Sequence, residues 1–281
     1  MINHRFKNII YEKDSETGVV EITLNRPEIK NALAIGLLIE LQDAVEMANK
    51  DEAVKGVIIT GARHPDQEDP TREAFSSGGY FDLSELESLD EETKNRFDFQ
   101  DIALKRLCLK MWQLDKPVIV AMNGLAIGGG FTIPLACADL IYASEHAWAR
   151  LPFVRLGIAP ELASSYLLPR LVGFQKAKEI MFFGEKISAQ EMCDMGVVNR
   201  VLPHKELLPY AREKMQALVP PGGAWMSVRQ TKAILHKPLI AEVTRALDLE
   251  NEVLNRLFGC SDFQEALTAR LEKREPSFKG A

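Results

Sequence analysis

Two glycine-rich turns constrain the fold of this chain most strongly. The first lies at residues 74–79 (AFSSGG) and the second at residues 123–130 (NGLAIGGG). The second directly follows an apolar run at residues 117–122 and precedes a predicted helix. A strand that ends in glycines and opens a helix leaves backbone N–H groups unpaired at a positive helix end. Two such turns facing each other would form a two-donor anion hole, which a reaction passing through an oxyanion or enolate requires.

Composition narrows the possible partners. Hydrophobic residues make up 46% of the 281 residues, enough for a sizeable core, and the formal net charge is −6. An acidic balance argues against non-specific nucleic-acid binding. No apolar stretch approaches the roughly 20 residues of a membrane-spanning helix, so we expect no membrane partner. The histidines have no metal-like spacing and the four cysteines are far apart, so we expect no metal site, reduced buried thiols and a cytoplasmic location.

Strands and helices alternate in the first part of the chain, which predicts an α/β fold. Strands are expected at residues 9–12, 19–24, 56–60, 117–122 and 139–143, and helices at 32–50, near Asp82 and at 91–114. From residue 160 the pattern becomes helical, with one late strand at 197–201. Helices are expected at 161–171, 174–182, 188–194, 204–219, 223–236, 240–258 and 261–273. We place a core domain at residues 1–200 and a helical region at residues 201–281.

Five ordered segments resemble the crotonase superfamily of enoyl-CoA hydratases and isomerases, over nearly the whole chain. Each is a weak signal alone, but their order is specific. The segments are NRPEIKNAL at 25–33, FSSGG at 75–79, NGLAIGGG at 123–130, GEKISAQE with GVVNRV at 184–201, and LEKREPSFKG at 271–280.

The resemblance implies a spiral of ββα units with two sheets meeting at a steep angle. It also implies a helical C-terminal region that builds homotrimers, commonly paired into hexamers. The implied substrate is an acyl-CoA thioester, with no separate cofactor because coenzyme A is part of the substrate. The backbone N–H groups of Gly79 and Gly129 would hold the thioester carbonyl and stabilise the enolate. The alternative is that both segments are ordinary tight turns.

Three positions depart from the hydratase pattern. Family hydratases use two glutamates, whose positions here are Thr132 and Phe153, and activation of water therefore lacks its usual base. Glu161 stands where hydratases usually carry glycine, and its segment resembles that of peroxisomal-type Δ3,Δ2-enoyl-CoA isomerases. There a single glutamate moves a proton between C2 and C4. Burial should raise the pKa of Glu161. Alternatively, Glu161 caps a helix that starts at Pro160.

The remaining site candidates line the expected substrate path. Tyr80 and Phe81 look inserted relative to the family and could reshape the acyl pocket. Arg26 and Lys30 lie in the segment that passes the coenzyme A phosphates in the family, although solvated surface charge explains them equally well. Further substrate-binding candidates are Ala74, Ser76, Gly78, Gly128, Thr132, Phe153 and Pro160.

Three functions remain open. The first is a Δ3,Δ2-enoyl-CoA isomerase with Glu161 as base. The second keeps the thioester substrate but is a hydratase or a thioester hydrolase. The third is a non-catalytic acyl-CoA-binding scaffold.

Overall fold

A large mixed sheet forms the centre of the molecule. The computed structural model describes residues 2–4, 6–80, 87 and 89–280. The first three strands pair with one another in antiparallel fashion, and all later neighbours in this sheet are parallel. Every residue of the two central strands, β4 (Gly56–Gly61) and β6 (Val118–Met122), is buried, as expected for apolar runs covered on both faces. In sheet order the strands are β1 (Ile2–His4), β2 (Ile9–Lys13), β3 (Val19–Leu24), β4 (Gly56–Gly61), β6 (Val118–Met122), β8 (Leu140–Ser144) and β11 (Arg200–Leu202).

A second, smaller sheet is built from very short strands. Two of its strands, β5 and β7, pair in parallel and consist of residues 74–76 and 125–127. The sequence pattern predicts turns at both places. The chain visits the large sheet, then the small sheet, then a helix, as in β6, β7 and the following helix α5 (Gly129–Cys137). This is the expected ββα order. The small sheet runs β10 (Ile187–Ser188), β9 (Trp148–Arg150), β7 (Leu125–Ile127) and β5 (Ala74–Ser76).

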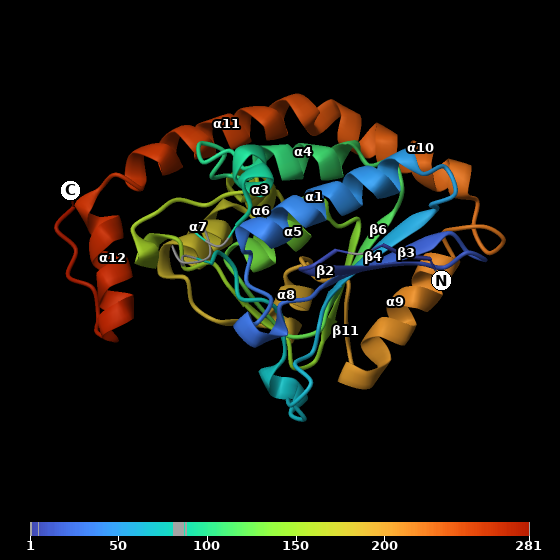
Figure 1. Ribbon diagram of the computed structural model, residues 1–281, viewed down its shortest axis with the longest axis horizontal. Helices are drawn as coiled ribbons and strands as arrows, with labels where there is room; N and C mark the ends of the chain where they lie inside the picture. Colours follow the sequence, from blue (N-terminus) through green and yellow to red (C-terminus); the bar gives the residue numbers. More distant parts are fainter. Residues whose placement is uncertain (1, 5, 81–86, 88, 281) are drawn as a thin grey trace.

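Helices cover the large sheet on both faces. On one side the main core holds α1 (Ile35–Lys50), α4 (Lys105–Gln113) and α5, with α6 (Ser164–Val172) packed on α5, and α11 (Ile240–Leu257) lies along the outside of α4 (Figure 1). On the opposite face α9 (Leu207–Gln216) contacts β4, β6 and β8. The domain boundary expected after residue 200 therefore falls inside β11, and α9 packs directly on the large sheet.

From residue 160 onward the chain is mainly helical as predicted, with shifted bounds. The late strand expected at 197–201 is β11, at 200–202, and the helix expected from residue 161 begins only at Ser164. The remaining helices of this region are α7 (Phe174–Phe183), α8 (Ala189–Asp194), α10 (Trp225–His236) and α12 (Ser261–Glu272).

Two further expectations need correction. The helix predicted over 91–114 is two helices, α3 (Glu91–Arg96) and α4, because the backbone becomes extended at Phe97 and stays non-helical up to the left-handed Leu104. Cys108 and Cys137 are buried, whereas Cys193 and Cys260 are partly exposed. The helix expected near Asp82 lies outside the described residues. Within the described ranges, no helix combines the length and apolar character that crossing a membrane requires.

Candidate active site

The two glycine turns lie against each other at the ends of β5 and β7. Parallel pairing aligns Ala74 with Leu125 and brings both strand ends to one edge of the small sheet. Gly78 has a φ of +83°, and a Cβ added there would lie 2.2 Å from the Ile127 carbonyl oxygen. A Cβ added at Gly130 would lie 2.3 Å from the Ser76 carbonyl oxygen. Both positions therefore require glycine, because the two backbones approach too closely for a side chain.

Two backbone N–H groups remain unpaired beside this contact. Within the described part of the chain, the N–H groups of Gly79 and Gly129 donate no hydrogen bond. Gly129 is the first residue of α5, where the helix leaves its N–H groups free at its positive end. The backbone N–H of Leu33 donates to the Gly78 carbonyl oxygen at 2.8 Å and so fixes the first turn. The arrangement can bind an anion or a polarised carbonyl oxygen.

The side chain of Glu161 lies beside the second of these donors. Its Oε1 would be 2.7 Å from a Cβ added at Gly129, so the missing side chain makes room for the carboxyl. The pKa of Glu161 is raised to about 8, first by burial and then by the nearby charge of Glu250. Such a group exchanges protons near neutral pH, as a carboxyl that acts in turn as base and acid must.

The side chains at the two family glutamate positions are uncharged and border the second turn. Thr132 lies three residues after Gly129 on α5 and is fully buried. Its hydroxyl lies near the Glu161 carboxyl and opposes the rise in its pKa, yet it forms no well-aligned hydrogen bond with a described residue. The Phe153 ring is buried and passes 3.7 Å from a Cβ added at Gly128. Among the described residues, Glu161 therefore supplies the carboxyl that lies against Gly129, whereas the Glu73 carboxylate accepts from Asn123 at the start of this turn.

Glu161 is not the cap of the following helix. The residues between it and α6, Leu162 and Ala163, are both in the left-handed region, and the helix begins at Ser164. The carboxylate that accepts from the start of α6 belongs to Glu250, on α11. Sequence reasoning missed Glu250. The available signal was an acid within the otherwise apolar buried stripe of α11: Val243, Leu247, Glu250 and Leu254.

The pKa of Glu250 is also raised, to about 7. Burial is the main cause, and hydrogen bonds from Ser165 and from the Ala163 N–H oppose it. Because these bonds occupy both of its oxygens, Glu250 is not free to take part in proton transfer as Glu161 is.

Most of the other predicted site residues lie at the paired turns or next to Glu161. Ala74, Ser76, Gly78 and Gly128 lie in or beside the paired turns, and the partly buried Pro160 adjoins Glu161. Tyr80 packs partly buried against the core, and Phe81 lies outside the described residues.

The predicted phosphate contacts lie farther along the surface. A cavity of about 180 Å³ is lined by Lys30, His64 and Arg72 together with Ala74 at the start of β5. Lys30 is exposed there, in keeping with a contact to phosphate or to solvent. Arg26 instead donates to Glu28 at 2.5 Å and to Asn8 at 3.1 Å.

The family model and the curated relatives that match this chain belong to the same family. Residues 14–281 match the model of the enoyl-CoA hydratase/isomerase family. A crotonyl-CoA hydratase of Syntrophomonas wolfei is 34% identical over 97% of this chain and 98% of its own length. A short-chain-enoyl-CoA hydratase of Clostridium acetobutylicum is 33% identical over 95% and 96%.

Solved structures agree with this result. The crystal structure of an enoyl-CoA hydratase/isomerase from Pseudoalteromonas atlantica superposes with a TM-score of 0.82 at 30% identity, covering 97% of this chain and all of that one. The α/β fold with two mixed sheets and a helical C-terminal region is therefore the crotonase fold. The chain belongs to the enoyl-CoA hydratase/isomerase family.

Proposed function

We propose that this protein is a Δ3,Δ2-enoyl-CoA isomerase. The observation that carries the proposal is the position of Glu161, a carboxyl with a raised pKa whose Oε1 lies against Gly129. The positions that hold the two glutamates of family hydratases carry Thr132 and Phe153. A 1,3-proton shift needs one carboxyl group, whereas hydration needs a base to activate water.

The reaction would proceed in two proton transfers. The thioester carbonyl oxygen accepts hydrogen bonds from the N–H groups of Gly79 and Gly129. The Glu161 carboxylate removes a proton from C2 of the 3-enoyl-CoA, and the negative charge moves to the carbonyl oxygen as a dienolate. The Glu161 carboxylic acid then returns the proton to C4, the double bond moves to C2–C3, and the carboxylate is restored. Each N–H donor contributes roughly 3–4 kcal/mol by binding the oxyanion.

The test uses purified protein and a 3-enoyl-CoA substrate. We expect formation of conjugated 2-enoyl-CoA, followed by its ultraviolet absorbance. Glu161→Gln preserves the shape of the side chain and should lower kcat by roughly 10²–10⁴-fold. Glu213→Gln, on the exposed surface of α9, is the matched control and should retain wild-type activity. Full activity of Glu161→Gln would overturn the assignment of the base.

Hydration of the double bond is the second candidate, favoured by the names of the two relatives, both hydratases. Under this alternative a water held near Glu161 would add to C3 of a 2-enoyl-CoA. The discriminating measurement is the rate of water addition to crotonyl-CoA relative to isomerisation of a 3-enoyl-CoA. If the protein hydrates crotonyl-CoA faster than it isomerises a 3-enoyl-CoA, the isomerase proposal is wrong and the hydratase assignment takes its place.

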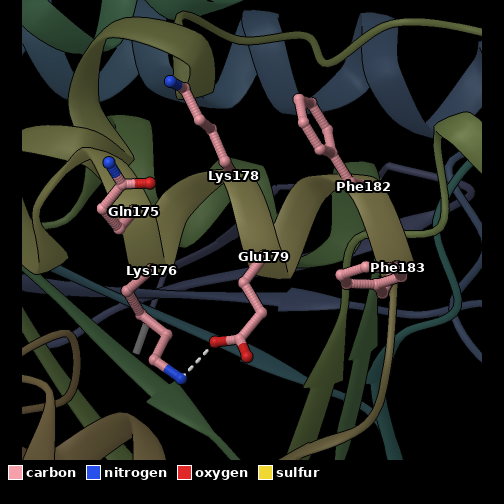
Figure 2. Close-up of a pocket in the computed structure, with 6 residues that line it drawn as sticks. All are labelled: Gln175, Lys176, Lys178, Glu179, Phe182 and Phe183. Atoms are coloured by element: carbon pink, nitrogen blue, oxygen red, sulfur yellow. Dashed lines mark hydrogen bonds and ion pairs between the residues drawn. The ribbon is translucent and has the colours of Figure 1, made fainter.

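We also propose that the chain assembles with copies of itself as a homotrimer or hexamer. The support is an apolar surface on α6 and α7, where Leu171, Phe174, Phe182 and Phe183 are 48–67% exposed. Figure 2 shows Phe182 and Lys178 on one side of α7 and the Lys176–Glu179 ion pair on the other. Exposed apolar patches of this kind mark association surfaces. Sedimentation velocity should give three or six times the chain mass, and a monomer at micromolar concentration would contradict the proposal.

A further inference from the structure

Glu250 is a buried carboxyl that the proposed reaction does not use. Glu250 lies on α11, and the residue is only 4% exposed. In the sequence it follows Glu161 by 89 residues. Its oxygens accept three hydrogen bonds from the start of α6. The donors are the Ala163 N–H at 2.7 Å, the Ser165 N–H at 3.1 Å and the Ser165 hydroxyl at 2.5 Å.

These hydrogen bonds hold a strained backbone segment. Leu162 and Ala163 have φ values of +55° and +56°, and neither is glycine. Each such residue costs roughly 1–2 kcal/mol and persists only where the surroundings enforce it. The Leu162 N–H donates to the Ala103 carbonyl at 3.1 Å, and Glu250 secures Ala163. Because this segment directly follows Glu161, it determines where the Glu161 side chain starts and which way it points.

Glu250 also acts on Glu161 through its charge. Its negative charge raises the pKa of Glu161, after the larger effect of burial. Among the described residues, the other titratable groups near Glu250 are the Cys108 thiol on α4 and Asp101, which accepts from the Asn251 side chain at 3.0 Å. Burial and the charges of Glu250 and Asp101 raise the pKa of Cys108, so the thiol stays neutral. Glu250 is therefore the charged group that can change the proton affinity of Glu161.

We propose that Glu250 is a positioning residue that clamps the start of α6, directs the Glu161 carboxyl toward Gly129 and tunes its proton affinity. The proposal rests on the proposed role of Glu161 as the acid–base group. A merely structural clamp would support the fold and leave the protonation of Glu161 unchanged.

The experiment separates charge from shape with two variants. Glu250→Gln keeps the size but removes the charge, and we expect the acid limb of the kcat/KM profile to move to lower pH by about one unit. Glu250→Asp keeps the charge but shortens the side chain, so kcat should fall by about tenfold while the limb stays in place. Glu252→Gln, exposed on the same helix, is the matched control and should change neither.

A second readout does not depend on activity. The titration midpoint of the Glu161 carboxyl can be followed by infrared difference spectroscopy, using Glu161→Gln to identify its band. Glu250→Gln should lower that midpoint. If the wild-type protein isomerises no 3-enoyl-CoA but the midpoint still moves, the proposed function fails and the coupling to Glu250 stands. A midpoint and an acid limb that both stay in place would overturn the role of Glu250.

A milder variant decides the matter if Glu250→Gln does not fold. Ser165→Ala removes the 2.5 Å hydroxyl donor, which favours the charged form of Glu250. Because Glu250 is then less often charged, the titration midpoint of the Glu161 carboxyl should fall, as in Glu250→Gln but by a smaller amount. An unchanged midpoint in a folded Ser165→Ala protein would count against the proposal.

Discussion

The glycine turns are held by backbone contacts between strands that are neighbours in the small sheet, whereas the backbone that follows Glu161 is held by a side chain from a distant helix. The first half of the candidate site depends on the absence of side chains at Gly78 and Gly130. The second half depends on two left-handed residues, of which Ala163 donates to the Glu250 carboxylate and Leu162 to the Ala103 carbonyl. The proposed oxyanion-binding part is therefore fixed by local geometry, and the proposed proton-transfer part is fixed by long-range packing.

Gly129 belongs to both halves, and its replacement should have the largest effect. A Cβ in Gly129→Ala would lie 2.7 Å from Glu161 Oε1 and 2.6 Å from Leu33 Cδ1. The added methyl group should displace the carboxyl and disturb the N–H donor, lowering kcat/KM by roughly 10²–10³-fold. Steady-state kinetics with a 3-enoyl-CoA measures the loss. Gly259→Ala, where a Cβ meets no atom closer than 3.4 Å, is the control. Equal activity of both variants would show that Glu161 does not lie against this turn.

The turn contact itself can be tested by stability. Gly78→Ala combines a φ of +83° with a Cβ 2.2 Å from the Ile127 carbonyl oxygen. We expect a loss of roughly 3 kcal/mol in the free energy of unfolding. Gly196→Ala has a similar φ of +76° but no atom within 4 Å, so it should lose only about 1 kcal/mol. Urea denaturation of both variants separates the contact from the backbone strain, and equal losses would argue against the close approach.

The raised pKa of Glu161 should make the stability of the folded protein depend on pH. The pKa of Glu161 is raised from 4.5 to about 8 in the folded protein, so the folded state binds its proton more tightly than the unfolded state. Stability from this group is complete below pH 4.5 and is lost as the pH rises through 8. Glu161→Gln removes that loss. Its Tm should exceed that of the wild type by a few degrees at pH 9 and equal it near pH 4. A Tm difference independent of pH would contradict a raised pKa.

Local patterns predicted the large sheet well and the small sheet poorly. The hairpin at 9–12 and 19–24 and the buried strand at 56–60 were predicted because apolar runs between turn residues are typical of strands. The three-residue strands β5, β7 and β9 are too short to show an alternating pattern, so 74–76 and 125–127 were interpreted as turns. The single helix expected over 91–114 was wrong because its amphipathic spacing continues through residues 97–104, where the backbone is not helical.

The same distinction applies to the site. The glycine turns could be located because tight backbone contacts require glycine, a residue visible in the sequence. Glu161 was found through its family resemblance. Glu250 could not be found this way, because its partners Ala163 and Ser165 are 87 and 85 residues distant and only the folded chain brings them together. Its position in a buried apolar stripe predicts a special role but not the partner.

The clamp from α11 has a consequence for the order in which the site is assembled. A ribosome makes the chain from its N-terminus, and domains begin to fold as they emerge. Both glycine turns and Glu161 are synthesised well before Glu250, which lies on the penultimate helix. A nascent chain can thus pair β5 with β7 early, but the residues after Glu161 gain their clamp only when α11 has emerged and docked. Translation that stops before α11 would yield a chain that carries every predicted catalytic group yet lacks the contact that we propose orients the Glu161 carboxyl.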